Sequence, residues 1–138
     1  MSLYSTFGVD QSENWVSVPD DNDVDVRFKL AFVNGPNSEY GKELEKAVRP
    51  HRRKHLRKGQ PAIDPDVLKG ILVDVFARTI LLDWENVCDR QGNPVPYTHE
   101  NAVRLLTELP VLYDILQIEA SEISNFQSEA LKDEAKNS

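Results

Sequence analysis

The chain has 138 residues, of which 40% are hydrophobic and 28% charged, a composition typical of one soluble globular domain with a modest core. No apolar run is long enough to cross a membrane and no signal sequence opens the chain, so we expect a cytosolic protein. The single cysteine excludes a disulfide within the chain, and the net charge of −7 disfavours binding to nucleic acid.

The first quarter of the chain predicts a loosely held arm followed by a β-hairpin. Residues 1–12 show no clean periodicity, whereas apolar residues alternate with charged ones over 24–32. The short apolar segment 15–18 precedes them across a turn-rich stretch, so we expect a hairpin over about 13–33. Two strands alone are marginal in water, and helices must therefore cover the face that carries the phenylalanines.

Apolar residues at helical spacing fill the rest of the chain. We expect helices over about 39–58, 65–83, 99–109 and 110–126. Ser38 and Asp64 are N-cap candidates, and Pro65 suits the first position of a helix. Pro50 is expected to kink the first helix without ending it, and the second helix is apolar over most of its circumference.

These elements predict an α+β fold that is mostly α-helical. The N-terminal β-hairpin packs on a small bundle of four to five helices, and residues 13–126 form one globular domain. Residues 127–138 are expected to be a polar tail with little to bury.

The stretch "LLDWENVCDRQGNPVPYTHENA", from Leu81 to Ala102, can be interpreted as a functional site or as a structural joint between two helices. Its acids and histidine could in principle serve acid-base chemistry; they are Asp83, Glu85, Asp89 and His99. No nucleophile or phosphate-binding loop lies nearby, and the segment around the glycine fails the register of a calcium-binding loop. The structural interpretation is favoured, with the joint formed by Trp84, Gly92, Pro96, Tyr97 and Thr98.

A stretch without acidic residues, from Lys46 to Ile63, contains seven basic ones. We call six of them the basic stripe: Arg49, Arg52, Arg53, Lys54, Arg57 and Lys58. The favoured interpretation is a solvated helix face, because the cations spread over more than half of the circumference. The alternative is a surface that docks an acidic partner. Single-stranded nucleic acid is a poor candidate, because no aromatic residue interleaves with the cations.

No catalytic residue, cofactor site or metal site is predicted. His51 and His55 have the spacing of two metal ligands on a helix, but an arginine follows the first histidine where zinc proteases need a glutamate. Glycine-rich phosphate loops, CxxC pairs and nucleophile elbows are lacking in the sequence. Cys88 is expected to be buried and unreactive, because no neighbour in the sequence would favour its thiolate.

The order of these features resembles the tail assembly chaperones of long-tailed bacteriophages. The similarity covers roughly residues 24–126 and is most specific from Asp83-Trp84 to Ala102. The resemblance implies a non-catalytic protein of the infected host's cytoplasm that is absent from the mature virion. It also implies two partners from the same phage, the tape-measure protein, which the chaperone keeps soluble, and the tail-tube protein, which it helps to recruit.

Other functions remain open beside the one that the resemblance implies. The chain could be a structural tail or neck component retained in the virion, or a small nucleic-acid-binding regulator that uses the basic stripe. Self-association is also left open. The resemblance further implies a ribosomal frameshift near the end of the frame, and Ala135-Lys136-Asn137 can be encoded by a slippery A-AAA-AAC heptamer.

Overall fold

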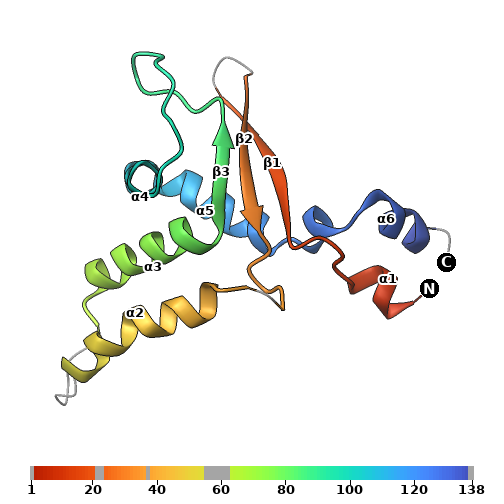
Figure 1. The fold of residues 1–138 in the computed structure, drawn as a ribbon, viewed down its shortest axis with the longest axis horizontal. Coiled ribbons are helices and arrows are strands. Elements are labelled where there is room, and N and C mark those ends of the chain that lie inside the picture. The colour runs from red at the N-terminus through yellow and green to blue at the C-terminus, as the bar shows by residue number, and fades with distance from the viewer. Residues whose placement is uncertain (1, 21–23, 37, 55–62, 137–138) are drawn as a thin grey trace.

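The computed structural model describes residues 2–20, 24–36, 38–54 and 63–136, and these form an α+β fold (Figure 1). The strands are β1 (Glu13–Pro19), β2 (Asp25–Ala31) and β3 (Leu81–Glu85). The helices are α1 (Leu3–Phe7), α2 (Tyr40–Lys54), α3 (Pro65–Thr79), α4 (His99–Glu108), α5 (Pro110–Ser121) and α6 (Glu129–Lys136), with the 3₁₀ helix η1 (Ile123–Phe126) before the last. The predicted fold class is confirmed.

The three strands form one antiparallel sheet in the order β1-β2-β3. Val16 of β1 lies opposite Phe28 of β2, which in turn lies opposite Trp84 of β3. All three side chains are buried. The alternation read from the sequence therefore places one apolar face of the sheet toward the helices, as expected for a half-buried antiparallel sheet.

The third strand corrects the prediction of a helix over 65–83. Helix α3 ends at Thr79, and the chain enters β3 at Leu81. The main-chain N–H of Ala31 donates to the carbonyl of Ile80 at 2.9 Å, at the point where the helix gives way to the strand. Pairing of β3 with β2 satisfies main-chain N–H and C=O groups on the outer edge of β2, which a two-stranded hairpin would leave unpaired. Apolar residues continue from the end of α3 into β3, so the periodicity of the sequence did not reveal the change from helix to strand.

Capping explains where two of the helices begin. The Asp64 carboxylate accepts a hydrogen bond of 2.8 Å from the N–H of Asp66 at the start of α3. The Thr98 hydroxyl accepts one of 3.0 Å from the N–H of Asn101 at the start of α4. Pro50 lies inside α2, as the sequence predicts, and the predicted extension of that helix to residue 58 lies outside the described residues.

The core lies between the apolar face of the sheet and helices α3, α4 and α5. Figure 1 shows α5 passing behind the strands and α2 running alongside α3. The largest fully buried side chains come from all of these layers: Phe28, Phe76, Phe126, Leu30, Ile80, Leu81, Leu106 and Leu116. Tyr113 of α5 meets Phe76 of α3 edge to face, with ring centroids 5.3 Å apart. Helices thus cover the aromatic face of the hairpin, as predicted.

The two ends of the chain differ from the expected loose arm and polar tail. They form α1 and α6, which lie side by side (Figure 1). Gln127 donates hydrogen bonds of 3.2 and 2.9 Å to two main-chain carbonyls in and just after α1. The N–H of Ser128 donates to the Asp10 carboxylate at 2.8 Å. These polar contacts join residues more than a hundred positions apart, which a local pattern cannot show.

Candidate functional site

The joint between β3 and α4 is held by two aromatic side chains. The indole Nε1 of Trp84 donates to the carbonyl of Val95 at 2.8 Å, and the Tyr97 hydroxyl donates to the carbonyl of Leu81 at 2.5 Å. The two rings meet edge to face with centroids 5.2 Å apart. Burial, and to a smaller extent the nearby negative charge of Asp83, raise the pKa of Tyr97 above its ordinary value of 10.0.

A tight turn lies at the tip of the joint. Gly92 has a φ of 84°, a left-handed conformation that side chains rarely adopt. The Asp89 carboxylate accepts hydrogen bonds of 2.9 Å from the N–H groups of Gln91 and Asn93. Below the turn, the Asn101 side chain donates to the carbonyl of Pro96 at 3.0 Å. These bonds order the segment from within.

The acids and the histidine of this stretch do not gather into a site. Glu85 forms an ion pair of 3.0 Å with an arginine of β2, and Asp83 accepts a bond of 2.8 Å from the next main-chain N–H. Asp89 holds the turn, and His99 contacts an aspartate of α3 at 2.8 Å. Each of these four groups has a separate local partner, so they do not come together in one cluster.

An open groove of about 960 Å³ lies beside the joint. Its walls come from the end of the hairpin, the joint itself and the link between α4 and α5, and they include Trp84, Leu109 and Leu112. Cys88 lies on the wall and is exposed, so the prediction that it is buried is wrong. It belongs to a surface loop in which it pairs with Pro94 in a single antiparallel bridge.

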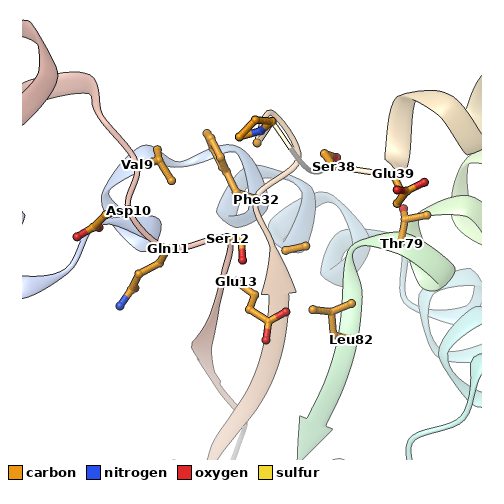
Figure 2. Close-up of a pocket in the computed structure, with 13 residues that line it drawn as sticks. Val9, Asp10, Gln11, Ser12, Glu13, Phe32, Ser38, Glu39, Thr79 and Leu82 are labelled. Carbon is orange, nitrogen blue, oxygen red and sulfur yellow. The ribbon is translucent and has the colours of Figure 1, made fainter.

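A second, smaller hollow of about 440 Å³ lies at the end of β2 (Figure 2). It is bordered by the segment before β1, the start of β1 and the segment before α2. The Glu13 carboxylate on its wall is 3.0 Å from Lys29 Nζ, and the Thr79 hydroxyl donates to the carbonyl of Val75 at 2.7 Å. Across the described ranges, no group of three or more histidine, cysteine or acidic side chains is placed to hold a metal ion.

The basic stripe is described only in part. Arg49 is exposed on α2, and Arg52, Arg53 and Lys54 lie in the last turn of that helix. Arg57 and Lys58 lie outside the described residues.

One exposed apolar surface was missed in the sequence. Val111, Ile115 and Ile118 of α5 are 70%, 37% and 64% exposed, and we call these three residues the α5 apolar face. Their spacing of four and three residues places them along one side of the helix. The available signal was that α5 is apolar on both sides, although only the side with Tyr113 and Leu116 enters the core.

The part of the chain that the structure describes has no helix long and apolar enough to cross a membrane. The chain matches none of the curated proteins and none of the solved structures with which it was compared. Residues 35–137 match a family model described as YdaY prophage protein. That range runs from before α2 to the end of α6 and includes both the joint and the α5 apolar face. The chain therefore belongs to the YdaY prophage protein family.

Proposed function

We propose that this prophage protein is a tail assembly chaperone, a non-catalytic protein that binds the tape-measure protein and helps to recruit tail-tube subunits. The observation that carries the proposal is the α5 apolar face, which leaves Val111 and Ile118 largely open to solvent. Contiguous exposed apolar side chains are typical of surfaces that bind other proteins. Family membership supports a phage origin, and the resemblance of the joint supports the assignment to tail assembly.

The proposed mechanism is shielding by binding. In this proposal the tape-measure protein exposes apolar helical stretches while it waits for its tail tube, and the α5 apolar face covers such a stretch. The energy comes from the apolar area removed from water, and charges around the face set the rate and the choice of partner. Because the acids of the joint have separate local partners, the proposal requires no chemical step.

Co-expression with the tape-measure reading frame of the same prophage tests this role. We expect the chaperone to raise the soluble fraction of the tape-measure protein and to co-purify with it. Ile115→Ser with Ile118→Ser should abolish both effects, whereas Val67→Ser, on an exposed part of α3, should preserve them. A tape-measure protein that is equally soluble with and without the chain would contradict the proposal.

The basic stripe can be tested in the same assay. If it docks an acidic segment of the partner, reversing Arg52, Arg53 and Arg57 to Glu should reduce the recovery of the complex. Unchanged recovery would identify the stripe as a solvated face and leave the apolar surface as the contact.

The rival role of a structural tail or neck component makes a different prediction. A chaperone acts in the host cytoplasm and leaves before the particle is complete. Mass spectrometry of particles purified after prophage induction should therefore detect tail-tube protein but not this chain. Its presence at a stoichiometry near that of a tail protein would favour the structural role.

The proposed role also includes a longer, frameshifted product. The nucleotide sequence that encodes Ala135 to Asn137 would contain the A-AAA-AAC heptamer if the frameshift occurs there. Synonymous codons that interrupt the heptamer should then remove a larger band from a blot probed against residues 1–126. Codons that already lack the heptamer would exclude this site.

A further inference from the structure

The α5 apolar face is opposite the side of α5 that builds the core. Tyr113, Leu116 and Ala120 are buried, while Val111 and Ile118 are exposed over most of their surface. Leu109, just before the helix, is 47% exposed and extends the apolar surface toward the joint. Helix α5 is 12 residues long, or about 18 Å, which is enough to contact a partner helix over three turns.

The charged residues of α5 and of the segments that flank it in the sequence are all acidic. Between Arg104 and Lys132 the sequence has five acidic and no basic residues. Asp114 lies three residues after Val111 and four before Ile118, so it adjoins the face directly. Glu122, four residues after Ile118, extends the same row and is exposed.

These border charges are not neutralised within the described part of the chain. Asp114 is exposed, and none of the ion pairs found among the described residues involves it or Glu122. The only hydrogen bond to the Glu122 side chain found there comes from the neutral hydroxyl of Ser124, at 3.4 Å. A partner that brings positive charge to this border would therefore find unpaired carboxylates.

The same charge argues against a second copy that packs through its own α5. A two-fold interface between α5 helices would bring acidic borders together across the contact, and like charges opposed in this way are unfavourable. An uncharged helix would gain from apolar burial alone, and an acidic helix would lose part of that gain to charge repulsion. A helix with lysine or arginine beside its apolar row would gain from both apolar burial and charge pairing.

We propose that α5 is a docking surface for an amphipathic helix whose apolar row is bordered by basic residues. Val111, Ile115 and Ile118 contact the apolar row, and Asp114 and Glu122 pair with the flanking cations. This deepens the proposed chaperone role and rests on it, because the docked helix would be a segment of the tail protein being held. The structure thus assigns a chemistry to the segment that the chaperone selects.

Two designed peptides test the surface without any tail protein. Both are amphipathic helices of about 18 residues with the same leucine row, one with lysines and the other with glutamates beside that row. Fluorescence anisotropy with the full chain should give a Kd about tenfold lower for the lysine peptide at low salt. The difference should shrink as salt is added, because screening weakens the charge pairs.

Variants locate the binding and identify its cause. Ile115→Ser with Ile118→Ser should weaken binding of the lysine peptide at least about tenfold. Val67→Ser, an exposed apolar residue on α3, is the matched control and should bind as the wild type does. Asp114→Lys with Glu122→Lys keeps the apolar face and should reverse the preference toward the glutamate peptide. Circular dichroism and a thermal melt show that each variant is folded before its binding is measured.

Several results would overturn the proposal. Equal affinity for both peptides, or binding that the charge reversal leaves unchanged, would show that charge does not select the partner. Binding of neither peptide would exclude a helix-docking surface. A wild-type dimer in sedimentation that Ile115→Ser with Ile118→Ser converts to a monomer would assign the face to a second copy instead.

The peptide and co-expression assays can fail separately. If the peptides behave as expected but the tape-measure protein does not co-purify, the docking surface remains and the chaperone role fails. If the tape-measure protein co-purifies equally with wild type and with Asp114→Lys and Glu122→Lys, the chaperone role remains and this surface does not carry it.

Discussion

The indole Nε1 of Trp84 donates a hydrogen bond of 2.8 Å to the main-chain carbonyl of Val95, which connects β3 to the segment that leads to α4. The same ring packs edge to face on Tyr97, whose hydroxyl donates a hydrogen bond to the carbonyl of Leu81, the first residue of β3. A strand, a loop and the approach to a helix are thus held together by one pair of aromatic side chains.

We expect Trp84→Ala to destabilise the protein by about 3–5 kcal/mol, because a buried aromatic ring and its hydrogen bond are lost together. Urea unfolding followed by circular dichroism measures the change. Trp84→Phe is the matched control, since it keeps much of the buried area and loses mainly the hydrogen bond. If Trp84→Ala unfolds like the wild type and only partner binding is lost, the joint is a binding site rather than a structural element.

Two tyrosine-to-phenylalanine changes should have different effects. Tyr97→Phe removes the donor to the carbonyl of Leu81 and should cost about 1 kcal/mol. Among the described residues the buried Tyr113 hydroxyl has no hydrogen-bond partner, so Tyr113→Phe should be neutral or stabilising by up to about 1 kcal/mol. Chemical denaturation of both variants measures the two changes in the free energy of unfolding. A loss for Tyr113→Phe as large as that for Tyr97→Phe would show that its hydroxyl is satisfied in solution.

Two glycine-to-alanine changes should shift stability in opposite directions. An added Cβ meets no atom within 4 Å at Gly92 or at Gly70, so steric clash does not separate them. Gly92 has a φ of 84°, and alanine there should destabilise by about 1 kcal/mol. Gly70 lies inside α3, and alanine there should stabilise by about 0.5–1 kcal/mol. Opposite shifts in melting temperature are expected, and a fall at Gly70 would contradict the helical assignment.

The contact between the chain ends should respond to acid. Hydrogen bonds from the hydroxyl and N–H of Ser128 lower the pKa of Asp10 from its ordinary value of 3.8. The lowered pKa means that the bonded carboxylate stabilises this contact above pH 3.8 and that the stabilisation is lost as pH falls through the lower folded value. The Ser128 amide resonance should therefore titrate with a midpoint below 3.8. In Asp10→Asn that transition should disappear, and a midpoint at or above 3.8 in the wild type would contradict the bond.

Local chemistry determined much of the fold from sequence alone. Alternation of apolar and charged residues identified the hairpin, because the two faces of a strand meet different surroundings. Asp64 marked the start of α3, because its carboxylate can accept a hydrogen bond from a main-chain N–H two residues ahead. Such interactions are short in sequence, so they can be predicted without the rest of the molecule.

Non-local pairing decided the features that the sequence did not show. Leu81 to Glu85 form a strand because β2 offers an open edge for pairing. By itself, Leu81 would fit the buried side of a helix equally well. Gln127 and Ser128 join the two ends of the chain through polar atoms that carry no periodic signal. Only the tertiary structure could distinguish the buried side of α5 from its exposed side. Hydrophobic residues lie along both sides of the helix, and only one side packs into the core.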